Sequence, residues 1–444
     1  MQDMTRGSIT RDIIKYSIPL IIGNVMQLTY NAADSVIIGK ALGEKALAAV
    51  STSNPIMTIM VLGASGIGIG SSVIMSNFYG AKDHRNLRRE FSTTVIFSTV
   101  FSLLVFVLGM IFSRHFLTWI NCPTNSLGMA TTYLRIIFVG FLFTFQYNIL
   151  SYSMRSIGDT KPPVYFLGVS CVINIVLDIL FVLVLDMKVV GAGVATVISQ
   201  AVSAVLCVVW IYQKIPELKL RRKDFVVDKE LLSETVKSGA LTALQQTALP
   251  GGKVLIQGVV NAQGTTAIGA FNAVCRVDDF ACIPSQSIGS GIMTCAAQNM
   301  GAGVKERVKK SFLSGLIITA CYFPIICIIA FLIKLPIMQA LCPDESITMI
   351  EMGVEYLSVK AWMFVLPCVM NAFQGFFRGV GKMNIVLIAT VLQMTIRTVC
   401  SYLWVPVIGI TGEAFASLAG WIIMLGFEGI CLFFEMRRIN RVMK

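Results

Sequence analysis

Polar residues lie inside long apolar segments of the chain, at spacings that would place them on shared helix faces. Gln27, Asn31 and Asp34 follow one another at intervals of four and three residues, so a helix would present them on one side. Asn174 and Asp178, four residues apart, share a face in the same way. Because an ionised side chain at the centre of a bilayer costs about 2.5–3.5 kcal/mol, these residues need either partners or a function.

Thr196 adds a hydroxyl in a third segment, one turn after the small residues GAG that begin at Gly191. Small residues let helix backbones approach closely and leave such a hydroxyl free to bond across the interface. Two carboxylates in one apolar pocket do not both ionise cheaply unless a cation lies between them. Hydroxyl, amide and carboxylate oxygens also suit a small hard cation. The residues therefore predict a site for H⁺, or for Na⁺ as its metal, formed by Asp34, Asn174, Asp178 and Thr196.

The chain repeats itself at an offset of roughly 221 residues. NFYGAKDHRNLRREF, starting at Asn77, matches QNMGAGVKERVKKSF, starting at Gln298. RSIGDTK, with Arg155, matches RGVGKMN, with Arg378, and GAGVAT matches GEAFAS. One duplication of this length predicts two similar bodies related by a pseudo-twofold axis.

The repeat also separates the two halves chemically. Asn174 aligns with Arg397, Asp178 with Ser401, and Asp34 with the apolar Leu255 or Ile256, whereas Thr196 keeps a hydroxyl partner in Ser417. The paired acids therefore belong to the first half, and we place cation coupling there. The alternative is a structural role, in which Asp34 bonds the Asn174 amide and locks two helices together.

Composition places both bodies in a membrane, since 55% hydrophobic residues, 14% charged residues and a mean hydropathy of +0.76 exclude a soluble domain of this length. A spanning helix needs about 20 mostly apolar residues. Twelve such runs occur, at 13–38, 47–76, 91–113, 128–153, 163–186, 190–212, 236–260, 266–296, 311–334, 350–376, 384–406 and 412–435. The sequence therefore predicts an all-α integral membrane protein of twelve transmembrane helices, arranged as two parallel six-helix repeats.

We divide the chain into an N-lobe (1–213, helices 1 to 6), a cytoplasmic linker (214–234) and a C-lobe (235–444, helices 7 to 12). The formal charge is +12, and the basic residues gather in loops on one side of the helix count, which places both termini in the cytoplasm. They are spread over short loops without interleaved aromatic residues, so nucleic acid is not an expected partner. Without a transit peptide, a bacterial inner membrane is the expected location, and we expect a monomer.

The order of the motifs resembles the multidrug and toxic compound extrusion (MATE) family, closest to its DinF-like branch. The resemblance covers essentially the whole chain and rests on Pro19 in helix 1, N-x-x-D at Asn31 and Asp34, GKALGEKALAAVS, RSIGDTKPP, N-x-x-x-D at Asn174 and GAGVAT. It implies export of cationic or amphipathic drugs in exchange for H⁺ or Na⁺ by alternating access, with two six-helix lobes around a V-shaped cleft. It also implies that Asp34, Asn174, Asp178 and Thr196 form the N-lobe cation site. Helix 7 has no acidic residue at mid-membrane, unlike the NorM-like pattern.

Other residues receive secondary roles. Pro19 is the predicted hinge of helix 1, and Arg276 and Asp279 are a candidate ion pair of the C-lobe. Residues on polar or soft faces that are candidates for the substrate cleft are Gln27, Tyr30, Asn31, Met57 and Asn148. No cofactor is expected beyond the coupling ion.

Two other functions remain open at this point. A lipid-linked saccharide flippase of the same superfamily would share the architecture, although the intramembrane cations are scattered here and do not form a strongly cationic cavity. An intramembrane aspartyl protease would need a G-x-G-D motif, and the nearest match is SIGD, from Ser156 to Asp159. We therefore expect a transporter of small molecules, embedded in lipid, and not an enzyme.

Overall fold

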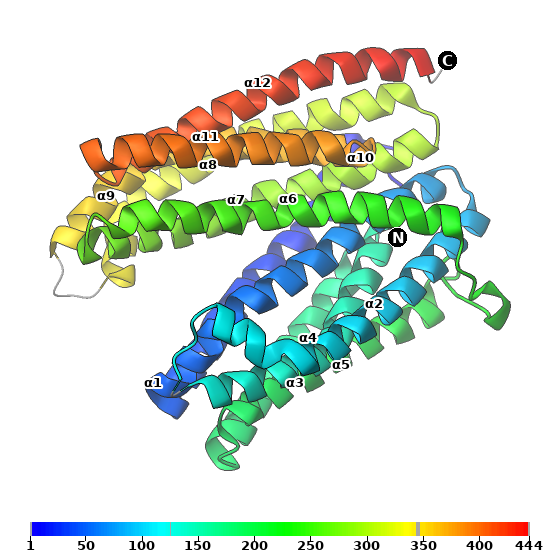
Figure 1. Ribbon diagram of the computed structural model, residues 1–444. Coiled ribbons are helices and arrows are strands. Elements are labelled where there is room, and N and C mark those ends of the chain that lie inside the picture. Colours follow the sequence, from blue (N-terminus) through cyan, green and yellow to red (C-terminus); the bar gives the residue numbers. More distant parts are fainter. Residues whose placement is uncertain (1, 125, 343–346, 443–444) are drawn as a thin grey trace. The chain divides into compact units, whose positions relative to one another are not determined.

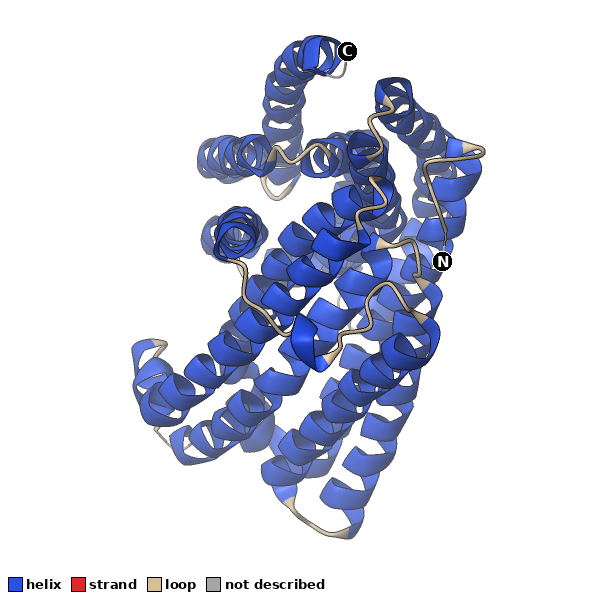
Figure 2. Cartoon of the chain, turned by 90° about the vertical axis from the view of Figure 1, so that its right-hand side faces the viewer, coloured by secondary structure: helices blue, strands red, loops and turns tan. Residues whose placement is uncertain are grey.

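The computed structural model describes the backbone of residues 2–124, 126–342 and 347–442, and the side chains of the same residues apart from 31–48 and 442. Within this part of the chain every regular element is helical, and short loops join the helices (Figure 2). Figure 1 shows the order of the elements along the chain. The all-α prediction is therefore confirmed.

All twelve runs predicted to span the membrane are helical. The elements are α1 (Ile9–Gly80), α2 (His84–Trp119), α3 (Leu127–Ser156), α4 (Lys161–Asp178), α5 (Lys188–Lys214), α6 (Lys229–Asn261), α7 (Thr265–Gly301), α8 (Lys305–Leu341), α9 (Ile347–Ala361), α10 (Val365–Gly379), α11 (Met383–Ile408) and α12 (Thr411–Val442). Three details differ from the prediction. α1 is helical through both of the first two runs. The run at 163–186 is divided between α4 and a π-helical turn that ends at Val184, and the run at 350–376 is divided between α9 and α10 by the 3₁₀ turn η3 (Trp362–Phe364).

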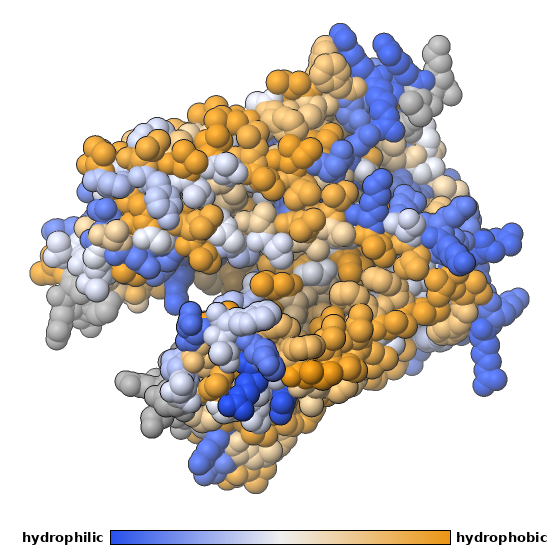
Figure 3. Space-filling view, in the orientation of Figure 1, coloured by the Kyte–Doolittle hydropathy of each residue, from blue (hydrophilic) through white to orange (hydrophobic). Residues whose placement is uncertain are grey.

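The helices expose apolar side chains along their lengths. Nine helical segments in the described part of the chain are long and apolar enough to cross a membrane. In α2 and α8 only 17% of the most apolar 18-residue stretch is buried inside the protein. Figure 3 shows hydrophobic residues along the sides of the helices and hydrophilic residues gathered toward their ends. Such helices bury their remaining apolar surface in lipid.

The chain forms two compact units, each with its own apolar core. The first contains residues 1–2 and 19–243, and the second contains 3–18 and 244–444. In the first unit α3 packs between α2 and α5, and α5 also packs on α4. In the second unit α7 packs on α8 and α10, and α11 and α12 lie side by side (Figure 1).

The N-terminal segment belongs to the second unit, which differs from the predicted N-lobe of 1–213. The Met4 N–H donates to Gln298 Oε1 of α7 at 3.0 Å, and the Thr294 hydroxyl of α7 donates to Tyr16 Oη at 2.9 Å. Ser17 Oγ donates to the carbonyl of Ser287 at 3.1 Å. Polar residues along α7 therefore hold the first turns of α1, and the first unit resumes at Pro19.

The predicted linker, 214–234, belongs to the first unit because polar groups of α2 hold it. The Val226 N–H donates to Ser92 Oγ at 3.1 Å, and Thr235 Oγ1 donates to the buried Glu90 Oε1 at 2.6 Å. Arg89 and Asp228 form an ion pair at 3.6 Å. The first unit extends through these contacts into α6 as far as Ala243.

Candidate functional site

Four of the residues singled out in the sequence lie in contact in the first unit. In the amide orientation that satisfies its neighbours, Asn174 donates to the Tyr30 hydroxyl at 2.9 Å and to Asp178 Oδ2 at 3.0 Å. Its carbonyl oxygen accepts from the Thr196 N–H at 3.1 Å. Asn174 and Asp178 are almost fully buried, at 1% and 0% exposure. Helices α1, α4 and α5 thus contribute to one buried polar cluster.

A change of helix type positions the carboxylate of this cluster. Asp178 is the last residue of α4, and the chain continues as a π-helical turn, η1 (Ile179–Val184). Such turns occur frequently at functional sites, because the wider helix leaves some carbonyls without their usual partners. Gly191 brings α5 against this turn, since a Cβ at this position would lie 2.9 Å from Phe181 Cβ. The small residue thus sets the close approach of α5 that the GAG motif predicts.

Thr196 contacts the polar cluster through its backbone N–H and not through its hydroxyl. Its Oγ1 donates to the carbonyl of Ala192 at 3.0 Å, within its own helix. Its N–H meets Asn174. Thr196 thus lies beside Asn174 and contacts it through its backbone N–H, whereas the sequence suggested its hydroxyl.

The predicted acid of α1 falls outside the described side chains. Asp34 and Asn31 lie in the helical stretch 31–48, whose side chains are not described. Tyr30, immediately before them, reaches the Asn174 amide. Tyr30 is therefore the contribution of α1 to the buried cluster among the described side chains.

The other candidate cleft residues have separate surroundings. Gln27 is exposed on α1. Met57 packs against an apolar cluster that includes Tyr133, Val182 and Val189. Asn148 donates to the carbonyl of Thr144 at 2.8 Å, inside α3. These three residues therefore do not join the cluster around Asn174.

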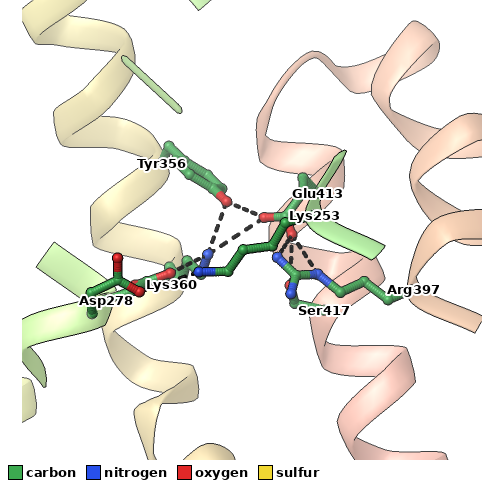
Figure 4. A network of polar contacts seen from close by, with 8 residues as sticks. Lys253, Asp278, Tyr356, Lys360, Arg397, Glu413 and Ser417 are labelled. Carbon is green, nitrogen blue, oxygen red and sulfur yellow. Dashed lines mark hydrogen bonds and ion pairs between the residues drawn. The ribbon is translucent and has the colours of Figure 1, made fainter. Parts of the chain in front are cut away.

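The second unit contains a larger buried network of ionised side chains (Figure 4). Glu413 of α12 is bonded by Arg397 of α11, with Nε 2.8 Å from Oε1 and Nη2 on the same oxygen. Ser417 Oγ also donates to Oε1, at 2.8 Å. The second carboxylate oxygen is bonded by Tyr356 Oη and lies 3.6 Å from Lys360 Nζ.

Lys360 extends this network to α7. Its Nζ lies 2.5 Å from Asp278 Oδ2 and donates to Tyr356 Oη at 3.1 Å. Asp278 and Glu413 are thereby balanced by Lys360 and Arg397, so these four ionised groups carry no net charge together. A buried charge is tolerated when it is paired and hydrogen-bonded in this way.

This network occupies the position in the repeat that corresponds to the first unit's cluster. Arg397 aligns with Asn174, and Ser417 aligns with Thr196. In the first unit Asn174 meets Thr196, and in the second unit both Arg397 and Ser417 bond Glu413. The second unit therefore holds its own guanidinium where the first unit offers amide and carboxylate groups.

The predicted ion pair between Arg276 and Asp279 is corrected by the structure. Asp279 instead meets Lys253 of α6, with Nζ 3.2 Å from Oδ1, and this pair is about half exposed. The spacing of three residues along one helix suggested Arg276 as the partner of Asp279. The sequence does not show that Lys253, on the neighbouring helix α6, lies closer. An exposed ion pair within apolar helices indicates a face in contact with water, since lipid would not solvate it.

The sequence reasoning missed Glu413 and Tyr356. Glu413 stands second in GEAFAS, where the matching GAGVAT has Ala192. An acidic residue among the small residues at the start of a transmembrane helix could have indicated a buried charge. Its partners come from α9 and α11, however, so the cations at Lys360 and Arg397 seemed scattered along the chain although they converge in space.

Comparison with known proteins agrees with the repeat and with the fold. A family model described as MatE matches residues 19–180 and again 242–403. A probable multidrug resistance protein of Bacillus subtilis, YpnP, is 30% identical over 69% of this chain and 68% of its own length. The multidrug export protein MepA of Staphylococcus haemolyticus is 22% identical over 97% of this chain and 93% of its own.

Solved structures share the whole fold. An outward-facing multidrug resistance MATE family transporter of the MOP superfamily superposes with a TM-score of 0.93 at 20% identity, covering 99% of this chain and 98% of its own. A MOP superfamily transporter from Pyrococcus furiosus, described as having reversed binding-pocket polarity and a suggested different function, gives a TM-score of 0.92 at 20% identity, with the same coverage. At this identity the fold is shared, and function must be argued from the chain's own groups. The two family matches, one in each half, show that the chain belongs to the MatE family of membrane transporters and is not an enzyme.

Proposed function

We propose that the protein exports cationic or amphipathic small molecules in antiport with H⁺ or Na⁺, by alternating access. The observation that carries this proposal is the buried cluster of Tyr30, Asn174, Asp178 and the Thr196 backbone. It offers a carboxylate and an amide in an apolar interior, which is the chemistry that a proton or small cation would exploit. The named relatives in Bacillus and Staphylococcus are multidrug resistance or export proteins, which supports drugs as the substrates.

The cluster also suggests how ion binding changes the conformation. The first turns of α1 are held on α7 through Tyr16 and Ser17, and the first unit resumes at Pro19. Bending at this proline would alter the approach of Tyr30 to Asn174. A cation that neutralises Asp34 and Asp178 would favour one packing of α1 over the other, and the ion gradient would then drive the change.

Topology completes the proposal. The basic loops on one side of the helix count favour cytoplasmic termini, and the bacterial relatives favour a bacterial cytoplasmic membrane. The protein would work as a monomer. A lipid-linked saccharide flippase is the less favoured function, because the cations Lys360 and Arg397 are neutralised by Asp278 and Glu413.

The test is efflux of ethidium or norfloxacin from proteoliposomes under an imposed pH gradient or an imposed Na⁺ gradient. Wild type should respond to one gradient, and Asp34→Asn should lose that response while remaining folded. Asp186→Asn is the matched control, since Asp186 is exposed in the loop two residues after η1 ends. Full gradient-driven export by Asp34→Asn would refute the assignment of the coupling site, and no export under either gradient would refute drug antiport.

A further inference from the structure

Glu428 of α12 is a buried carboxyl that the network around Glu413 does not use. Its exposure is 0%. Neither of its oxygens has a hydrogen-bond partner among the described residues. An isolated ionised carboxylate in such a place is very costly, and a protein avoids the cost by keeping the group protonated.

The neighbouring charge is Arg378, at the end of α10. Its guanidinium is close enough for its charge to act on Glu428. Its Nη2 donates to Gln245 Oε1 of α6 at 2.6 Å and to Gln374 Oε1 at 3.3 Å. Both glutamines donate in turn to the Thr390 hydroxyl of α11, at 3.2 and 3.4 Å. Arg378 therefore ties α6, α10 and α11 together, and its positive charge also acts on Glu428 of α12.

Other charged groups near Glu428 already have partners. Lys382, just before α11, lies 3.9 Å from Glu435 Oε2, and Arg438 bonds the same carboxylate at 2.8 Å. Cys431, one turn after Glu428, is close enough to feel its charge. The α6 residue that accepts from Arg378 is the neutral Gln245. A charge on Glu428 would therefore be balanced by Arg378.

The internal repeat shows what is special about this position. Arg155 corresponds to Arg378, and Cys207 corresponds to Glu428, because Cys207 follows Gly191 at the distance by which Glu428 follows Gly412. The Arg155 charge acts on Cys207 as that of Arg378 acts on Glu428. Cys207 lies in an apolar core with Tyr147. The arginine occurs in both halves, whereas the second half replaces a thiol with an acid.

We propose that Glu428 is a second proton-binding site, and that loss of its proton transfers Arg378 from Gln245 to Glu428. The O–H bond of the carboxyl breaks, the proton passes to water, and the carboxylate accepts the hydrogen bond from Arg378 Nη2 that Gln245 Oε1 had accepted. Arg378 of α10 then no longer holds α6, and it binds α12 instead. Proton binding at Glu428 and the transfer of Arg378 do not depend on the proposed antiport.

Infrared difference spectroscopy of the reconstituted protein tests the site directly. At neutral pH, wild type minus Glu428→Gln should show the C=O stretch of a protonated carboxylic acid. Wild type minus Glu435→Gln should lack it, since Glu435 is paired with Lys382 and Arg438. If Glu428→Gln does not fold, Glu428→Cys restores the group found at the matching position. A spectrum in which Glu428 contributes only carboxylate bands overturns the proposal.

The transfer of Arg378 has its own readout. A cysteine pair that reports the separation of α6 and α10, read by spin labels, should show α6 moving as pH rises in wild type but not in Glu428→Gln. An equal movement in both proteins would overturn the transfer. If wild-type export proves independent of a pH gradient, the proposed H⁺ antiport fails, whereas the infrared result for Glu428 is unaffected.

Discussion

Arg397 of α11 and Glu413 of α12 are joined through two guanidinium nitrogens that share one carboxylate oxygen, in the buried interior of the second unit. The other oxygen of Glu413 faces Tyr356 and Lys360. The internal repeat aligns Arg397 with Asn174, which lies beside Asp178 in the first unit. Two copies of one ancestral unit have thus acquired different charge states at the same place. In the second unit the carboxylate is neutralised by its own arginine, and in the first unit an amide lies beside a carboxylate.

Removing one partner of the Arg397–Glu413 pair should destabilise the protein strongly. Arg397→Met leaves Glu413 with too little positive charge in a buried site, and breaking such a pair costs about 3–5 kcal/mol. The double variant Arg397→Met/Glu413→Leu leaves Lys360 paired with Asp278, so it should recover a large part of that loss. The free energy of unfolding in detergent measures both effects.

A surface pair provides the control for this experiment. Arg438→Gln removes a partner of Glu435 whose side chain is 53% exposed, and such pairs contribute about 0–1 kcal/mol. If Arg397→Met cost no more than Arg438→Gln, the buried network would not be important for stability.

Asp178→Asn should strongly reduce ion-driven export while preserving the fold. Asparagine keeps the shape of the side chain and an oxygen that can accept from the Asn174 amide, but it carries no charge to exchange with a cation. We expect about a tenfold or greater fall in the initial efflux rate, equivalent to about 1.4 kcal/mol or more in the barrier. Asp186→Asn, at an exposed position with a φ of 48° that asparagine tolerates, should export normally. Equal rates for the two variants would remove Asp178 from the coupling site.

Much of the fold could be predicted from the sequence, because an apolar run of membrane length is a one-dimensional signal. The meeting of Asn174 with Asp178 follows from a spacing of four residues on one helix. Gly191 and Thr196 placed α5 beside them, since a small-residue entry predicts close packing. Each of these inferences needed only neighbouring residues.

The structure was needed wherever the partner lies on another element. Glu413 binds residues of α9 and α11, and Asp279 pairs with Lys253 of α6. Neither relation has a fixed spacing along the chain. The hydrogen bond from the Val226 N–H of the linker to Ser92 could not be predicted from the sequence either, because a polar loop has no periodic pattern.

Replacing Pro19 by alanine should reduce export without reducing stability. Proline inside a helix removes a backbone hydrogen bond and is about 3 kcal/mol less favourable than alanine there, so Pro19→Ala should keep or raise the melting temperature. If bending at Pro19 drives the movement of α1, efflux should fall several-fold. Pro55→Ala removes the other proline of α1 and should leave export nearly unchanged. Similar export by both variants would show that Pro19 is not the hinge.

Gly375 should be the least replaceable of the glycines at the crossing of α7 and α10. A Cβ at this position would lie 2.2 Å from the carbonyl oxygen of Gly289, and backbone cannot yield as a flexible side chain can. Overpacking of this kind costs about 1–3 kcal/mol, so Gly375→Ala should lower the melting temperature by several degrees. Gly429, inside α12, has no neighbouring atom within 4 Å of a built Cβ. Gly429→Ala should therefore stabilise the helix by about 0.5–1 kcal/mol. A neutral Gly375→Ala would mean that α7 and α10 can separate at no cost, and the close crossing of these helices would then not stabilise the second unit.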